Sequence, residues 1–181
     1  VIVPLTSKAK LNIRASLYVD ALRRNGIDYF VTVPDWVQLA LHLRIEAGEP
    51  GITNVPCCNE EQAVAVAAGL WMGGKKPIVV VQNQGMHACI NSIRTVGNDV
   101  RAPIVFLIGQ FGREFANFGQ DPTESRRSTV RYLEPVLHAM DIRSWRLESE
   151  EDMPKFDEAF RYAWTESRPA ALLVGAPTGW N

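Results

Sequence analysis

Short apolar runs alternate along the chain with longer segments in which apolar residues recur three and four positions apart. The short runs are rich in Val and Ile, and turn residues separate them from the longer segments. This alternation is typical of βα units, in which helices cover both faces of a parallel sheet. The pattern therefore predicts an α/β fold with a mostly parallel sheet of about six strands.

The expected elements follow from these periods and from their turn signals. The predicted strands are Tyr29 to Val33, Ile52 to Pro56, Ile78 to Val81, Pro103 to Ile108, Arg143 to Leu147 and Ala170 to Val174. The predicted helices are Ile13 to Arg24, Trp36 to Ala47, Glu60 to Met72, Met86 to Val96, Thr129 to Met140 and Asp152 to Glu166. The run Ile78 to Val81 is apolar on consecutive residues, which places it at the sheet centre.

One polar segment interrupts this order. Residues Gly109 to Ser128 carry several charges and three glycines, and they show no period. Loops of this length are uncommon in a compact domain and are often functional, so we expect this one to contribute to a site.

Length, charge and cysteine content exclude several classes of protein. The 181 residues, 46% of them hydrophobic, predict one domain over residues 1–181. A net charge of −1 gives no basic surface for nucleic acid. We find neither a signal peptide nor an apolar run of the roughly 18 residues that a membrane helix requires. Three cysteines without disulfide or zinc spacing favour a reducing cytoplasm.

The segments that directly follow the predicted strands are the candidates for a site, because ligands of open α/β sheets bind beyond the carboxyl ends of the strands. These segments are Pro34-Asp35, Cys57 to Glu60, Gln82 to His87 and Gly109 to Glu114. All four are polar or contain glycine, as a shared site would require.

The segment from Asn59 to Gly69 has a purely structural explanation. Asn59 is a good N-cap residue, Gln62 stands where a capping box requires it, and Glu60 and Glu61 complement the positive end of a helix. The small residues that follow are also compatible with close helix packing alone.

The same segment resembles the pyrimidine-binding domain of thiamine-diphosphate decarboxylases and acetohydroxyacid synthases. The resemblance rests on a glutamate, Glu60, that is followed by Ala63, by the pair Ala67-Ala68 and by Gly69. The stretches Val79 to Met86 and Ile108 to Glu114, together with Asn91, are similar to the phosphonopyruvate and sulfopyruvate decarboxylase branch. The resemblance extends from the first predicted helix to the last strand.

The resemblance implies a proton-transfer role for Glu60. In such enzymes a carboxylic acid bonded to ring nitrogen N1′ favours the imino tautomer of the aminopyrimidine, which then removes the thiazolium C2 proton. Burial in an apolar crevice would favour the protonated carboxyl that this bond requires. The cofactor-binding residues implied by the resemblance are Pro34, Asp35, Cys58, Glu60, Gln84, Gly85 and Asn91.

The resemblance also implies a partner. Members of this family hold the diphosphate through Mg²⁺ bound by a domain that carries Gly-Asp-Gly, and this sequence has no such motif. Either a diphosphate-binding beta subunit supplies it in a hetero-oligomer, or the sequence is a fragment. The end at Gly175 to Asn181 favours a complete small subunit.

The expected substrate contacts are Gln84, His87 and Arg113. His87 stands where related decarboxylases usually have glycine, and it either caps a helix or lies over the reactive carbon as a second catalytic residue. Arg113 follows a strand closely and is preferred to Arg126 and Arg127 as the cation for a second anionic group. His42 and His138 are expected to be ordinary helix residues, and the cysteines to be packed small residues.

These observations predict a flavodoxin-like, doubly wound domain that acts as the alpha subunit of a thiamine-diphosphate enzyme. The expected reaction is the non-oxidative decarboxylation of a small anionic 2-oxo acid, active only with the partner subunit. Two alternatives remain open, a carboligase or lyase subunit with the same cofactor and a non-catalytic interaction module of the same fold. A Gly-x-Gly-x-x-Gly or Walker loop after the first strand is absent, which disfavours ordinary nucleotide binding.

Overall fold

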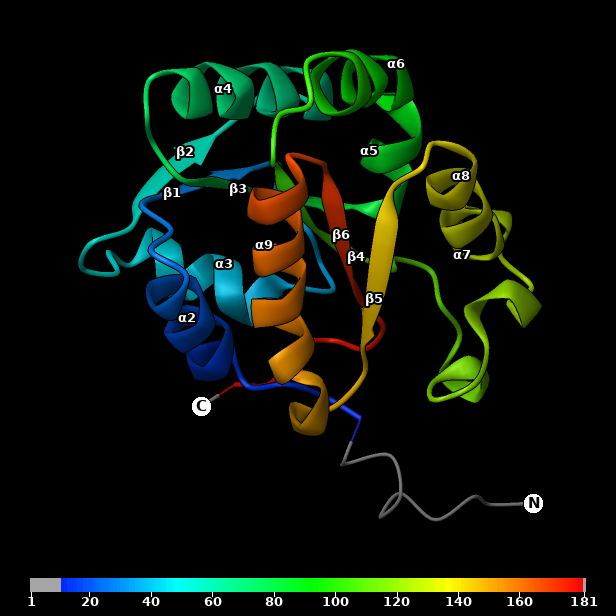
Figure 1. The fold of residues 1–181 in the computed structure, drawn as a ribbon. Helices are drawn as coiled ribbons and strands as arrows, with labels where there is room; N and C mark the ends of the chain where they lie inside the picture. Colours follow the sequence, from blue (N-terminus) through cyan, green and yellow to red (C-terminus); the bar gives the residue numbers. More distant parts are fainter. Residues whose placement is uncertain (1–10, 181) are drawn as a thin grey trace.

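The computed structural model describes residues 11–180, and within them the chain forms a six-stranded sheet (Figure 1). The strands are β1 (Tyr29–Thr32), β2 (Thr53–Pro56), β3 (Pro77–Gln82), β4 (Val105–Gly109), β5 (Arg143–Leu147) and β6 (Ala170–Val174). Their order across the sheet is β2-β1-β3-β4-β6-β5, and all neighbouring strands are parallel. The flavodoxin-like α/β prediction is therefore confirmed, and β3 lies at the sheet centre as expected.

Helices cover both faces of the sheet (Figure 1). One face carries α2 (Ala15–Arg24), α3 (Leu39–Glu46) and α9 (Pro154–Glu166). The other carries α4 (Glu60–Met72), α5 (Asn83–Ala88), α6 (Ile90–Ile93), α7 (Ser128–Arg131) and α8 (Leu133–Ala139).

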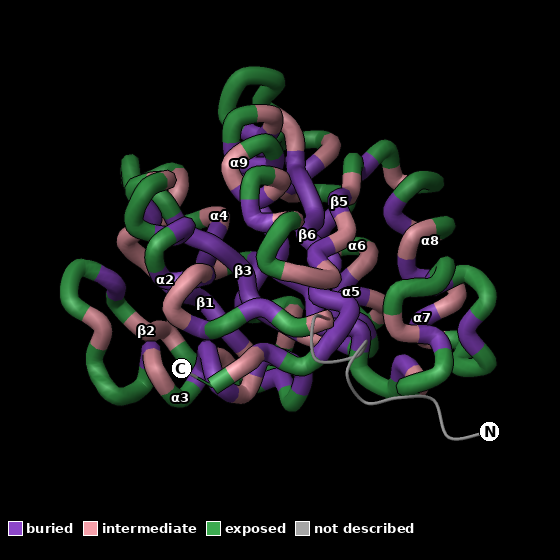
Figure 2. Tube along the Cα trace, turned by 90° about the horizontal axis from the view of Figure 1, so that it is seen from below, coloured by how far each residue is buried: buried purple, intermediate pink, exposed green. Residues whose placement is uncertain are grey.

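The sheet separates two apolar cores because successive strand residues point to opposite faces. In β3, Ile78 and Val80 join the core beneath α2, α3 and α9, whereas Val79 and Val81 join the other core. All four side chains are fully buried. Figure 2 shows these buried strands enclosed by helices whose outer sides are exposed.

Two predicted helices are interrupted in the structure. The predicted helix Met86 to Val96 starts earlier, at Asn83, and continues through α5, α6 and a π-helical turn at Arg94–Asp99. The predicted helix Thr129 to Met140 is divided at Tyr132. Pro135 explains this break, because a proline has no N–H to donate to the carbonyl of Arg131 one turn earlier.

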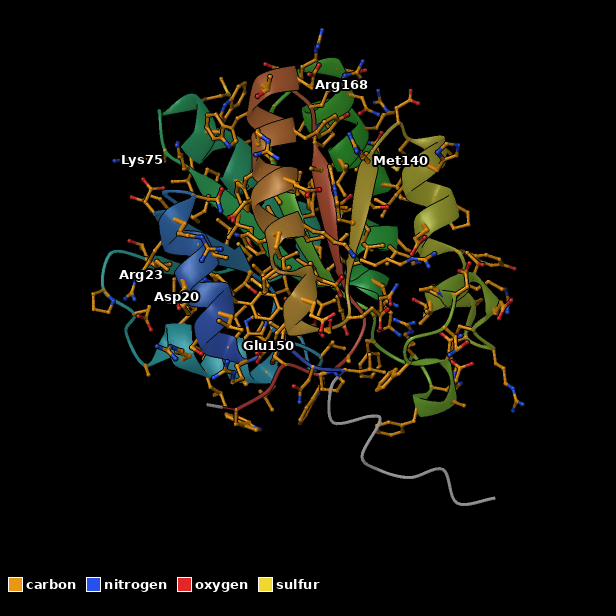
Figure 3. All side chains as sticks on the ribbon, turned by 60° about the horizontal axis from the view of Figure 1, so that its bottom comes forward. Asp20, Arg23, Lys75, Met140, Glu150 and Arg168 are labelled. Carbon is orange, nitrogen blue, oxygen red and sulfur yellow. The ribbon has the colours of Figure 1, made fainter. Side chains whose placement is uncertain are left out.

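The long loop also has structure of its own. Between β4 and α7 the chain forms two 3₁₀ turns, Phe115–Asn117 and Pro122–Glu124. Met140 and Arg168 precede β5 and β6, and Figure 3 shows them at the end of the sheet opposite Glu150, which follows β5. Since all strands run in the same direction, the loops that follow them gather at the Glu150 end of the sheet.

Candidate functional site

The chain changes direction across the sheet at β1. It proceeds from β1 to β2 on one side and then crosses to β3 on the other side of β1. The connections therefore diverge beyond the carboxyl ends of β1 and β3, and such a switch point is where open α/β sheets leave a crevice. The four polar segments predicted from the sequence follow β1, β2, β3 and β4 and thus border this crevice.

Glu60 reaches from the first turn of α4 to the segment after β3. Asn59 caps this helix, since its side-chain oxygen accepts a hydrogen bond from the Gln62 N–H at 2.8 Å. The Glu60 side chain lies directly on Gly85, so closely that a Cβ on Gly85 would overlap Cγ, Cδ and Oε1 of the glutamate. The predicted pair Glu60 and Gly85 is thus in contact.

The carboxyl group of Glu60 is available to a ligand. Glu60 is half-buried, and among residues 11–180 its carboxylate has no hydrogen-bond or ion-pair partner. The neighbouring Glu61 is exposed. A capping role does not account for the position of Glu60, because Asn59 and Gln62 supply the cap and the Cys58 N–H binds Gln62 Oε1 at 2.7 Å.

Asn83 connects the loops after β3 and β4, a role that the sequence did not indicate. Its side chain is fully buried. Its Nδ2 donates hydrogen bonds to the carbonyl oxygens of Phe111 at 3.1 Å and Thr129 at 3.3 Å. Its Oδ1 accepts the Gln84 N–H at 3.0 Å. We call the contacts of Asn83 with Phe111 and Thr129 the Asn83 clasp.

His87 is oriented by the same carbonyl oxygen. Its Nε2 lies 3.0 Å from the Thr129 carbonyl oxygen, and its ring is half-buried. A carbonyl only accepts, so Nε2 carries the proton of this bond and Nδ1 is the acceptor nitrogen of the neutral ring. Of the nitrogens of His87, Nδ1 is therefore the one that can accept a proton.

Asp35, after β1, lies between this strand and the end of β4. It is 2% exposed. Its carboxylate accepts hydrogen bonds from the Val37 N–H and from Gln38 Nε2, both at 2.9 Å, and from the Gly109 backbone. Burial raises the pKa of Asp35 to about 6, and these hydrogen bonds oppose the shift. A Cβ on Gly109 would overlap the carboxylate, so this position requires glycine.

The expectation that His42 is an ordinary helix residue is wrong. His42 is 3% exposed and packs edge-on against Phe30. Its Nε2 accepts the Asp35 backbone N–H at 3.1 Å. Burial lowers the pKa of His42 to about 4, which keeps the ring neutral and able to accept this bond. Gln38, also fully buried, extends the polar group by donating to the carbonyls of Val81 and Leu107.

The structure places Arg113 inside the fold. Its five N–H groups donate to the side chains of Asn117, Gln110 and Glu148 and to the backbone carbonyls of Asn117 and Gln120. Its side chain is completely buried. Gly175, at the end of β6, leaves the space in which Arg113 and Glu148 meet. A substrate contact by Arg113 would require one of these five bonds to break.

The remaining predicted residues differ in their surroundings. Pro34, Cys58, Gln84 and Asn91 are exposed. The Asn91 side-chain oxygen accepts a bond from Arg94 Nη2 at 3.2 Å, so this amide is engaged on the surface of α6. Cys89 is a buried thiol whose pKa burial raises to about 12, which fits the expected packing role.

Within residues 11–180 no group of three or more His, Cys, Asp or Glu side chains is arranged to hold a metal ion. None of the helices in that range combines the length and apolar character needed to cross a bilayer.

Comparison with known proteins gives a family match. Residues 14–130 match the family described as "Thiamine pyrophosphate enzyme, N-terminal TPP binding domain". The chain is 27% identical over 165 residues to sulfopyruvate decarboxylase subunit alpha of Methanocaldococcus jannaschii, covering 90% of this chain and 94% of that protein. It is 34% identical over 89 residues to the subunit of the same name from Methanothermobacter thermautotrophicus, covering 49% and 53%.

Two longer proteins are also similar to this chain. A protein named sulfopyruvate decarboxylase, from Methanosarcina acetivorans, is 23% identical over 90% of this chain, which spans 40% of its length. The solved structure of benzoylformate decarboxylase from Polynucleobacter necessarius superposes with a TM-score of 0.69 at 16% identity. This match covers 91% of this chain and 30% of the other, and it shows a shared fold.

Proposed function

Because the chain belongs to the family of N-terminal TPP-binding domains of thiamine pyrophosphate enzymes, we propose that it is the pyrimidine-binding alpha subunit of a two-subunit decarboxylase. Its substrate would be a small anionic 2-oxo acid that resembles sulfopyruvate or phosphonopyruvate. The relatives named sulfopyruvate decarboxylase subunit alpha support the reaction class. The observation that carries the proposal is the unpartnered Glu60 carboxyl above Gly85 at the switch point.

The surroundings of Glu60 support this proposal. A protonated Glu60 carboxyl can donate a hydrogen bond to a ring nitrogen, and within residues 11–180 nothing else bonds to it. Gly85 lets the glutamate side chain lie flat against the backbone, which would fix the position of the carboxyl. Neither feature is needed for the cap of α4, which Asn59 already supplies.

Four residues of this chain would then have separate tasks. Thiamine diphosphate, when bound, supplies the nucleophilic carbon and the electron sink that decarboxylation of a 2-oxo acid requires. Glu60 would hold a proton at the pyrimidine ring. His87 would accept or return a proton at Nδ1, because its Nε2 is committed to Thr129. Asp35 and His42 would fix the loop after β1, which borders the same crevice.

The proposal includes a partner subunit with a Gly-Asp-Gly motif that holds Mg²⁺ and the diphosphate. Its support is that the relatives from Methanocaldococcus jannaschii and Methanothermobacter thermautotrophicus are named as alpha subunits, and that Gly-Asp-Gly is absent from this sequence. The Methanosarcina relative carries the same function name on a chain more than twice as long, so the same proposal allows the second half of the site to be fused in some members.

The test is reconstitution with a diphosphate-binding subunit from the same genome. The two proteins would be co-expressed and assayed for carbon dioxide release from sulfopyruvate, phosphonopyruvate and pyruvate, with and without thiamine diphosphate and Mg²⁺. We expect release that depends on both subunits and on the cofactor. A complex that assembles and binds the cofactor, yet releases no carbon dioxide from any of these acids, would contradict the proposal.

A further inference from the structure

The segment between β4 and α7 contains an open pocket of about 560 Å³ (Figure 1 shows the segment at lower right). Its walls contain two of the three arginines that the sequence suggested as anion ligands. The lining residues are Glu114, Ala116, Asn117, Gln120, Glu124, Arg126 and Arg127. Arg113 is excluded as the free cation because all its N–H groups are bonded within the fold.

The two arginines differ in their surroundings. Glu114 accepts hydrogen bonds from the Arg126 backbone N–H and from Ser125 Oγ, both at 2.7 Å. These bonds hold the pKa of Glu114 down at about 2, and its negative charge interacts with the Arg126 side chain. The guanidinium of Arg126 therefore has an anion beside it.

Arg127 has no such partner. Within residues 11–180 its guanidinium makes neither a hydrogen bond nor an ion pair. Its aliphatic stem passes Gly112, where a Cβ would lie 3.9 Å from Arg127 Cγ, an ordinary packing distance. Glu124, also on the wall of the pocket, is exposed to solvent, which screens its charge.

Hydrogen bonds connect the backbone near Arg127 to His87. Gly112 follows Phe111, whose carbonyl accepts a bond from Asn83, and Thr129 follows Arg127 by two residues. The Thr129 carbonyl is bonded both to Asn83 and to His87. The Asn83 clasp thus holds the backbone two residues after Arg127 against His87, and the Arg127 side chain lines the pocket on the other side of this short link.

We propose that Arg127 binds the second anionic group of the substrate and makes the site selective for 2-oxo acids with two charges. This inference rests on the proposed function and identifies the residue that selects its substrate. A guanidinium offers paired donors to a sulfonate, phosphonate or carboxylate, and Arg127 has both of its donor edges free within residues 11–180. Arg126 is the matched neighbour, exposed in the same pocket but beside Glu114.

The experiment compares Arg127→Met, Arg127→Lys and Arg126→Met in the complex with the diphosphate-binding subunit. Steady-state kinetics would be measured with sulfopyruvate, which has two anionic groups, and with pyruvate, which has one. Loss of a hydrogen bond to a charged group predicts that Arg127→Met raises KM for sulfopyruvate about 10- to 100-fold and leaves kcat/KM for pyruvate within about threefold. Arg127→Lys should recover part of the loss, and Arg126→Met should change neither value more than about threefold.

A binding measurement separates this inference from the proposed function. Calorimetry with 3-sulfopropanoate and propanoate, which lack the keto group, should show that Arg127→Met removes the preference for the sulfonate. Equal losses for both acids, or an equal effect of Arg126→Met, would overturn the role of Arg127. A wild-type complex that prefers 3-sulfopropanoate but decarboxylates nothing would instead overturn the proposed function and leave the role of Arg127 standing.

Discussion

Glu60 lies against Gly85 so closely that the smallest side chain at position 85 would displace it. The two residues belong to different βα units, since Glu60 begins α4 and Gly85 lies in α5. The absence of a side chain at Gly85 therefore determines where the carboxyl group of Glu60 lies. The first prediction follows from this contact.

Gly85→Ala should reduce turnover and leave the fold intact. The overlapping atoms belong to a glutamate side chain that can move away, and alanine is the better helix former, so the melting temperature should change little. A displacement of the acid by about 1 Å can cost about a hundredfold in rate. Thermal unfolding and kcat would be measured together, and full activity in a folded variant would show that the contact is not needed.

Glu60→Gln should lower turnover by about 10² to 10⁴-fold, the contribution typical of a positioned acid. The amide keeps the size of the side chain but has no proton to transfer. Glu61→Gln is the matched control, because Glu61 is the exposed neighbour in the same helical turn. Equal losses in the two variants would assign the effect to charge at the start of α4 instead of to Glu60.

Asp35 and His42 should make opposite contributions to the pH dependence of stability. His42 has a folded pKa of about 4 against an ordinary 6.5, so its contribution is lost as the pH falls from 6.5 to 4. Asp35 has a folded pKa of about 6 against an ordinary 3.8, so the folded state binds the extra proton and stability falls as the pH rises from 4 to 6. In the wild type these two slopes offset each other.

Asp35→Asn should make the contribution of His42 to the pH dependence of stability measurable. With the acid removed, the free energy of unfolding should rise between pH 4 and 6.5 by on the order of 3 kcal/mol. His42→Gln should give the reverse slope over pH 4 to 6. Urea denaturation at a series of pH values checks both, and parallel profiles for the wild type and the two variants would show that neither group titrates as described.

Arg113→Met should destabilise the fold by about 3 kcal/mol, because it leaves the Glu148 carboxylate and the Gln120 carbonyl without their donor. The matched variant Arg143→Met removes a cation that stacks on Trp145 and Tyr162 at the other end of the sheet, and it should cost less. Urea denaturation measures both. If Arg113→Met left the urea midpoint unchanged and raised KM, Arg113 would instead be a substrate ligand.

Asn83→Ala should loosen the segment between β4 and α7 without melting the sheet. The change leaves the Phe111 carbonyl without its donor and the Thr129 carbonyl with His87 alone, and the loss of such bonds costs about 1 to 3 kcal/mol. Hydrogen exchange should become faster for residues 110–129, while the amides of β3 and β4 remain protected. Unchanged exchange in that segment would mean that the clasp does not hold it.

The sequence predicted those features that depend on local signals. The helix Glu60–Met72 has the predicted bounds because a capping asparagine and paired glycines define its ends, and the strand Ala170–Val174 has them because it is a run of apolar residues. The strand Arg143–Leu147 also has the predicted bounds. The prediction for the helix after β3 is wrong in its first residue and in its continuity. Apolar spacing gives the face of a helix but not the residues at which the backbone changes its winding.

The site residues that the sequence missed depend on contacts between distant segments. Arg113 was chosen because it follows a strand, but Glu148 reaches it from the end of β5, and only the order β4-β6-β5 brings these ends together. His42 is a different case, because its partners Thr32 and Asp35 are near in the sequence but belong to the strand and loop before its helix, and helical periodicity does not indicate such contacts. The family resemblance supplied Glu60, which local signals explained equally well as a helix cap.

The Asn83 clasp is made with main-chain oxygens at Phe111 and Thr129, and substitution of those two side chains leaves the oxygens in place. The exposed residues between these anchors, unlike the buried Arg113, can therefore vary while the base of the loop stays attached to Asn83. Variation confined to this one short stretch would leave the contact between Glu60 and Gly85 unchanged, because both residues lie outside it.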